Sequence, residues 1–228
     1  MKKKSAFTMI ELVFVIVVLG ILASIAMGRM ERDLQQEASS TILSHIRLAQ
    51  QLAMSDNKHR RDNNNNWQRA YWRIQFKNCN PSGTVKAIYN VGSDSDLSGG
   101  DISKSESAID HVTGKYLYAT CFENSLSNDV SENIRIGKKF GVSSVNITGC
   151  GTIGGSVANQ IAFDYLGRPH RGVTIYTVGS SFNKMVITDC RVNVNLLTDQ
   201  DNDGVLDSFT IVVEADTGHA FIVGQENS

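Results

Sequence analysis

The sequence contains little proline and almost no net charge. Of its 228 residues only 2 are proline, and 22 Lys and Arg residues against 23 Asp and Glu residues leave a formal net charge of -1. Proteins that bind nucleic acid generally are basic overall, so this balance argues against that class. The chain is 41% hydrophobic and 20% charged, which excludes a wholly disordered chain and a polytopic membrane protein.

Sequence signatures of catalysis are also missing. The chain has no Walker, HExxH or GxSxG motif, and its five histidines show no spacing typical of a catalytic triad. Residues 149–154 match GxGxxG formally. A dinucleotide site would need a helix to open there, whereas a further glycine follows and a strand is predicted near Gln160. The sequence therefore predicts a protein that is not an enzyme.

One long apolar run lies near the start of the chain. Residues 7–28 read FTMIELVFVIVVLGILASIAMG. As a helix they would rise roughly 33 Å, enough to span a bilayer core of about 30 Å. Residues 1–6 form a leader with three lysines, so the positive-inside rule keeps the N-terminus in the cytoplasm. Everything after Arg29 is then predicted to lie across the membrane.

Glu11 interrupts this run with a carboxylate. A carboxylate inside a bilayer costs a few kcal/mol or more unless it is paired, so Glu11 is a candidate functional residue. A cut between Ala6 and Phe7 would create a positively charged amine at nearly the same depth. Two other interpretations stay open, a secretory signal cut near residues 24–26 and an uncleaved anchor, but neither gives Glu11 a use.

The segment KKKSA-FTMIEL of this chain, together with the long apolar run that follows it, resembles the N-terminus of type IV pilins and type II secretion pseudopilins. The resemblance implies that a prepilin peptidase in the inner membrane cuts before Phe7 and that the new terminus is N-methylated. It also implies that Glu11 pairs with the terminal amine of a neighbouring subunit during filament assembly. Ala6 departs from the family, since most members have Gly at that position.

Residues 29–56 continue with the pattern of an amphipathic helix. Apolar residues recur at steps of four and three from Met30 to Ala53, without a proline or glycine after Gly28. The sequence predicts one long helix whose second half, residues 29–56, lies on a globular domain. His45 is predicted at the helix surface or the core edge and not as a ligand, since no second His or Cys lies one turn away.

A cluster of cations follows the helix, in and after the loop-like segment DNKHRRDNNNN of residues 56–66. One interpretation is a solvated helix end. The other is a phosphate-binding patch in which Trp67, Tyr71 and Trp72 stack on bases, although these aromatics also suit the core face of a strand. Some minor pilins are implicated in DNA uptake, so a nucleic-acid or ligand-binding module is the alternative function. The patch would comprise Lys58, Arg60, Arg61, Arg69 and Arg73.

Residues 57–228 are predicted to form one periplasmic β-rich domain, because after Trp67 the pattern changes to a period of two, which is typical of half-buried strands. The predicted fold class is α+β, a long N-terminal helix packed on an antiparallel β-rich domain, as in pilins. Residues 92–110 are expected to be an exposed excursion, and Pro169 is expected to stop strand pairing after a turn at Gly167. The predicted strands are 70–77, 84–91, 115–122, 133–136, 144–148, 160–164, 173–177, 185–196, 209–214 and 220–223.

Two late segments are similar to the GspH/FimT group of minor pseudopilins and minor pilins. They are the strand and turn FDYLGRP of residues 163–169 and the turn Thr217-Gly218-His219. The resemblance implies a minor structural subunit whose partners are other pilin or pseudopilin subunits, the prepilin peptidase and methyltransferase, and the inner membrane.

Four cysteines, all beyond the apolar run, favour two disulfides in an oxidising compartment. Four cysteines allow three pairings; joining nearest neighbours gives Cys79–Cys121 and Cys150–Cys190. No CxxC pair exists, which disfavours a metal or redox site.

The segment TDQDNDGVLD of residues 198–207 resembles the start of a calcium loop. Acids alternate, Gly204 allows a sharp turn, and a Ca²⁺ ion would relieve the repulsion between crowded carboxylates. Thr210 stands where a bidentate Glu would complete an EF-hand, and a plain Asp/Asn turn is the alternative. No cofactor is required, and Ca²⁺ is the one possible structural ion. The candidate ligands are Asp199, Asp201, Asp203, Val205 and Asp207.

Overall fold

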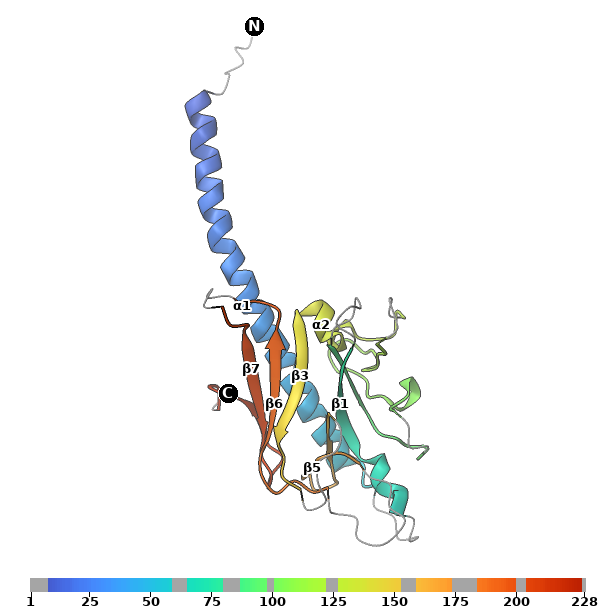
Figure 1. The fold of residues 1–228 in the computed structure, drawn as a ribbon. Coiled ribbons are helices and arrows are strands. Elements are labelled where there is room, and N and C mark those ends of the chain that lie inside the picture. Colours follow the sequence, from blue (N-terminus) through green and yellow to red (C-terminus); the bar gives the residue numbers. More distant parts are fainter. Residues whose placement is uncertain are drawn as a thin grey trace.

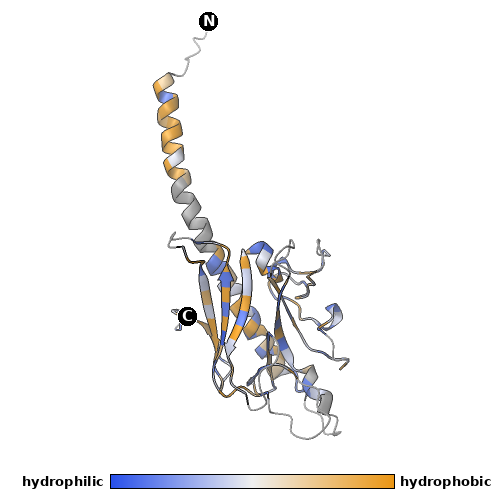
Figure 2. Ribbon diagram, viewed as in Figure 1, coloured by the Kyte–Doolittle hydropathy of each residue, from blue (hydrophilic) through white to orange (hydrophobic). Residues whose placement is uncertain are grey.

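The computed structural model describes residues 8–58, 65–79, 87–97, 101–121, 127–152, 159–173, 184–199 and 204–226. A single helix, α1 (Met9–Ser55), has 47 residues and so is roughly 70 Å long. Its first half projects away from the rest of the protein, and its second half packs on two β-sheets (Figure 1). The described part of the projecting half is mostly hydrophobic, interrupted by one hydrophilic stretch near its start (Figure 2).

All strand pairs in the two four-stranded sheets are antiparallel. The first sheet has the order β2-β1-β4-β5 and the second β3-β6-β7-β8. Four short helical segments, η1, η2, η3 and α2, complete the described elements. The bounds are η1 Asn65–Ala70, β1 Trp72–Asn78, β2 Ala87–Gly92, η2 Lys104–Glu106, η3 Glu132–Ile134, α2 Ile136–Lys139, β3 Val142–Gly149, β4 Gln160–Phe163, β5 Pro169–His170, β6 Cys190–Leu196, β7 Ser208–Val213 and β8 Ala220–Ile222.

The core lies between the second half of α1 and the inner faces of both sheets. The buried helix positions follow the spacing of four and three that the sequence shows, which places them on one face. The α+β fold class, with an N-terminal helix on antiparallel sheets, is therefore confirmed. The described core of α1 begins at Ala38, while Leu34 is 37% exposed. The stripe consists of Ala38, Ile42, Ile46, Ala49 and Ala53.

Side-chain amides join the two sheets where no strand pairs them. Asn78 donates to the Val145 carbonyl at 3.0 Å and accepts from the Val145 N–H at 2.9 Å, as a neighbouring strand would. Asn159 accepts from the Ile147 N–H at 3.2 Å and donates to the Val145 carbonyl at 2.6 Å. These bonds satisfy backbone groups along the outer edge of β3.

Polar contacts also hold α1 to the sheets. Gln50 Nε2 donates to the carbonyls of Gly167 at 3.0 Å and Thr217 at 2.9 Å, so one side chain reaches the turns after β4 and β7. Arg47 donates to the Ala220 carbonyl through Nε at 3.2 Å and Nη2 at 2.9 Å. The turns that contain Gly167 and Gly218 are therefore both tied to the helix.

The prediction that residues 92–110 form an exposed excursion is wrong for residues 92–97 and 101–110, which the structure describes. The chain turns back along β2, where the Ser93 N–H donates to the Glu106 carbonyl at 3.1 Å and the Ala108 N–H to the Val91 carbonyl at 2.8 Å. Ile102 is 1% exposed. The Ser, Asp and Gly content indicated a loop correctly, but this loop covers the free edge of a strand.

Two predicted strands are also wrong, as is the prediction that strand pairing ends at Pro169. Residues 133–136 lie in η3 and α2, because Ser131 accepts from the Asn133 N–H and starts a helical turn. In the described part of 115–122, Tyr116 makes only isolated bridges. Pro169 does not end pairing: it is the first residue of β5, a position where a strand does not need its missing N–H, and lies opposite Phe163 of β4.

Apart from the strand predicted over 173–177, the other predicted strands correspond to observed ones with shifted ends. The strand predicted over 185–196 begins at Cys190, and Met185 and Val186 form isolated bridges. Of the strand predicted over 173–177, only Val173 lies within the described residues. Residues 84–86 also lie outside them.

Two disulfides, Cys79–Cys121 and Cys150–Cys190, are formed, which is the nearest-neighbour pairing. The paired cysteines are 42 and 40 residues apart in the sequence. By reducing the conformational entropy of the unfolded chain, each disulfide raises the free energy of unfolding by about 4 kcal/mol. The first joins the end of β1 to the chain that covers β2, and the second joins the end of β3 to the start of β6.

Candidate functional site in the projecting half of the helix

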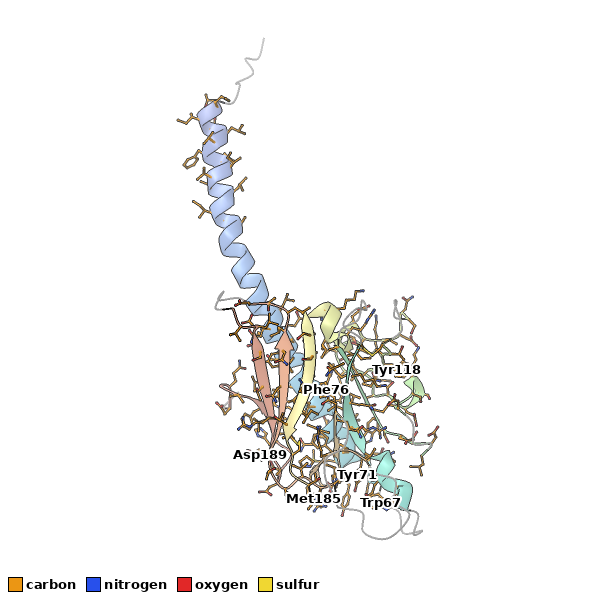
Figure 3. The ribbon with its side chains drawn as sticks, in the orientation of Figure 1. Trp67, Tyr71, Phe76, Tyr118, Met185 and Asp189 are labelled. Atoms are coloured by element: carbon orange, nitrogen blue, oxygen red, sulfur yellow. A yellow bond between two sulfur atoms is a disulfide. The ribbon has the colours of Figure 1, made fainter. Side chains whose placement is uncertain are left out.

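The projecting half of α1 presents large apolar side chains to solvent. Every residue from Thr8 to Ala23 is exposed, and the side chains point outward around the helix (Figure 3). A soluble monomer rarely exposes a continuous apolar surface of this size, so this half of the helix needs a partner or a lipid environment. The exposed large side chains are Met9, Ile10, Leu12, Val13, Phe14, Val15, Ile16, Val17, Val18, Leu19, Ile21 and Leu22.

In the described part of the chain, no helix meets the length and hydropathy needed to cross a membrane. The span over residues 7–28 stays a prediction, as do the domain limits at residues 6, 28 and 56.

The start of α1 is built around Thr8 and Glu11. Thr8 is the N-cap, with extended backbone angles (φ -80°, ψ 148°), and its Oγ1 accepts a hydrogen bond from the Glu11 N–H at 3.3 Å. The Thr8 carbonyl accepts the helix bond from the Leu12 N–H at 3.2 Å. Glu11 therefore lies in the first turn, on the exposed part of the helix. Ala6 and Phe7 lie outside the described residues.

The basic cluster does not form an open cationic surface in the part that the structure describes. Lys58 pairs with Asp56 at 2.6 Å, and Arg73 is 2% exposed on β1. Trp67 and Tyr71 are buried and lie at the end of the domain opposite the projecting helix (Figure 3). Arg60, Arg61 and the side chain of Arg69 lie outside the described residues, so the nucleic-acid patch stays a prediction.

The predicted calcium loop connects β6 and β7, and the structure describes its two ends. Asp199 Oδ2 accepts from the Gly204 N–H at 3.0 Å, and Asp207 Oδ2 accepts from Thr198 Oγ1 at 3.1 Å. Val205 is 67% exposed. Asp201 and Asp203 lie outside the described residues, so the ion site stays a prediction. The bonds present are those of a turn closed by Asp side chains.

A buried polar cluster around His45 was not expected from the sequence. His45 is 4% exposed; its Nδ1 lies 2.6 Å from Tyr89 Oη and its Nε2 lies 3.8 Å from the Asp110 carboxylate. Burial lowers the pKa of His45 against the opposing effect of Asp110, so the imidazole is neutral near pH 7. Asp110 also accepts from Ser131 at 3.0 Å. The cluster fixes the covering segment to α1, a structural role.

A second buried cluster centres on Asp164, in the turn between β4 and β5. Asp164 is 0% exposed and accepts from the N–H groups of Leu166 and Arg168 at 3.0 Å each and from Arg168 Nε at 2.9 Å. His170 Nε2 lies 3.3 Å from the same carboxylate. Burial raises the pKa of Asp164, but the bonds from His170 and Arg168 outweigh it, and the net pKa lies below the usual range. The motif FDYLGRP signals this turn, because an Asp four residues before an Arg can close it.

Three acids, Asp94, Asp96 and Glu106, bring carboxylate oxygens within 4.8 Å of one another. Glu106 uses its oxygens for the backbone N–H groups of Ser95 at 2.9 Å and Ser103 at 3.0 Å. These bonds shape the loop that covers β2, so the cluster is explained as a loop-closing network.

Comparison with known proteins gives one match. Residues 1–27 match the family model of the prokaryotic N-terminal methylation motif. No curated protein and no solved structure matches the chain. The matched residues include Ala6, Phe7, Thr8 and Glu11 and run into the exposed apolar part of α1, so the motif and the unburied surface coincide. The motif supports a pilin-like N-terminus that is processed by a prepilin peptidase.

Proposed function

We propose that this protein is a structural subunit of a pilin-like filament, a minor pseudopilin or minor pilin. A prepilin peptidase in the inner membrane cuts the precursor between Ala6 and Phe7 and the new terminus is methylated. The mature chain then packs into the filament through the projecting half of α1. The β-sheet domain faces outward, and the protein has no catalytic role.

The single observation that carries this proposal is the coincidence of the methylation motif with the exposed apolar half of α1. The folded domain buries one face of the helix from Ala38 onward and leaves Met9 to Leu22 without any covering. A helix that is apolar on all sides requires lipid or other helices around it. A bilayer before assembly and neighbouring subunits after assembly supply these two environments in turn.

Glu11 has a role in both environments under this proposal. Its carboxylate is the one acid among the described residues from Thr8 to Ala23. Removing it from water without a partner is costly, whereas a pair with the Phe7 amine of a neighbour offsets that cost. The pair therefore favours subunits that enter at the correct depth.

The test is the intact mass of the mature protein isolated from cells that contain the peptidase. The proposal predicts a chain that starts at Phe7 and carries one methyl group. A chain that still starts at Met1, or one cut after residue 26, would refute it.

The alternative function, capture of DNA or another ligand through the Lys58–Arg73 segment, has weaker support. Of its described cations, Lys58 is paired and Arg73 is buried. Measuring the binding of duplex DNA to the protein at several salt concentrations tests this alternative. An affinity that falls steeply with salt would support the alternative, and no salt-sensitive binding at moderate ionic strength would dismiss it.

A further inference from the structure

The start of α1 has a second polar residue, the N-cap Thr8, to which the function proposed above assigns no role. Thr8, Met9, Ile10 and Glu11 have the spacing of a capping box, in which a Thr at the N-cap and a Glu three residues later each satisfy one backbone N–H of the other. The structure contains one half of this arrangement, the bond from the Glu11 N–H to Thr8 Oγ1 at 3.3 Å.

The other half concerns the Glu11 carboxylate. Within the part of the chain that the structure describes, this carboxylate has no hydrogen bond or ion pair. Thr8 therefore caps the helix with its hydroxyl, while the carboxylate is left available for a partner outside the chain.

We propose that Thr8 is a positioning residue that keeps the Glu11 carboxylate available for the amine of the neighbouring subunit. This inference rests on the proposed function. The N–H groups of the first helical turn have no partner within the helix, and in apolar surroundings each unsatisfied one is costly. Without the Thr8 hydroxyl, the Glu11 N–H loses its acceptor. The carboxylate of Glu11 can bend back to this N–H and take the place of the hydroxyl.

Thr8 therefore acts through Glu11, and this distinguishes a positioning role from a general effect on the helix. A carboxylate that caps its own helix is lost to the neighbour's amine, so assembly weakens although Glu11 is intact. If Thr8 only prevented fraying of the helix end, its removal would weaken assembly by the same factor whether or not Glu11 is present.

The experiment measures the fraction of processed full-length chain that enters filaments in cells, with processing followed by intact mass. Normalising to the processed chain removes any effect of position 8 on the peptidase. The variants are Thr8→Ser, which keeps the hydroxyl, Thr8→Val, which removes it at nearly constant shape, Glu11→Gln, and the double variant Thr8→Val with Glu11→Gln. Thr41→Val makes the same chemical change inside the same helix and serves as the matched control.

Thr8→Ser and Thr41→Val should assemble like the wild type, and Thr8→Val should assemble about twofold to thirtyfold less well, the range for loss of an N-cap. The double variant should assemble no worse than Glu11→Gln alone. The inference is overturned if Thr8→Val matches Thr8→Ser or if the two losses multiply in the double variant. A Glu11→Gln protein that assembles normally refutes the electrostatic part of the proposed function and the inference with it. A Glu11→Gln protein that assembles poorly, together with a Thr8→Val protein that assembles like Thr8→Ser, overturns the inference alone.

Discussion

Removal of residues 1–33 should convert the protein from an associating chain into a soluble monomer. The described core of α1 begins at Ala38, so this deletion leaves both sheets, both disulfides and the packed part of the helix in place. The remaining segment of α1, residues 34–55, is still held by Gln50 and Arg47. The deletion thus removes the projecting surface and retains the fold.

The size of the effect follows from the exposed side chains. Twelve large apolar residues between Met9 and Leu22 are 36% to 85% exposed. Complete burial of a fully exposed side chain of this kind contributes about 1.5–3 kcal/mol. Because the twelve are on average roughly 60% exposed, burying what remains contributes on the order of 10–20 kcal/mol. Association costs an estimated 4–15 kcal/mol, so the upper part of this range leaves the roughly 8 kcal/mol that holds chains together at micromolar concentration.

Sedimentation in buffer without detergent measures this difference. The full chain should sediment as large assemblies or require detergent, and the deletion variant should sediment as a monomer with a cooperative thermal transition. A full-length chain with Val13→Lys and Val17→Lys separates apolar surface from helix length, since lysine retains helix propensity; it should associate less than the wild type. A monomeric full chain, or a deletion variant that associates as strongly, would refute the reasoning.

Three further predictions concern the folded domain. Because the pKa of Asp164 lies below its usual range, its stabilising effect is complete above about pH 4 and is lost as the pH falls through the folded value; Asp164→Asn should lower the free energy of unfolding at pH 7 by roughly 2–4 kcal/mol and flatten its dependence on acid pH in denaturant titrations. Gly218→Ala places a Cβ against the Gly167 carbonyl at a φ of +68°, whereas Gly114→Ala has the same φ and open space, so Gly218→Ala should lower the melting temperature more than its control. If the β6–β7 loop binds Ca²⁺, added calcium should raise the melting temperature and chelator should reverse the rise, and equal midpoints would count against the site.

Much of the fold can be predicted because its pattern is local. The helix stripe from Ala38 to Ala53 and the period of two in β1, β6 and β7 each follow from which face is buried. One error comes from a local cap and another from a contact between segments. Residues 133–136 alternate as a strand does, yet they form helical turns because Ser131 caps the first of these. Composition shows that residues 92–110 are a loop, but it cannot show that this loop lies along β2.

The candidate site shows the same limit. Glu11 stands out in the sequence because a charge in an apolar run is costly, and that signal needs no structure. Thr8 does not stand out, since its role depends on which residue begins the helix, and the structure shows this at Met9. His45 looked like a surface or edge residue because its partners, Tyr89 and Asp110, come from segments far along the chain.

Assembly of a Glu11→Ala chain in cells tests the central claim most directly. Glu37→Ala is the matched control, because Glu37 lies on the same helix and pairs with Lys139 of its own domain at 2.8 Å. The measured quantity is the fraction of processed protein recovered in filaments. The account predicts that Glu11→Ala is cut before Phe7 but enters filaments poorly, while Glu37→Ala enters normally. Incorporation of both variants at the wild-type level would contradict it.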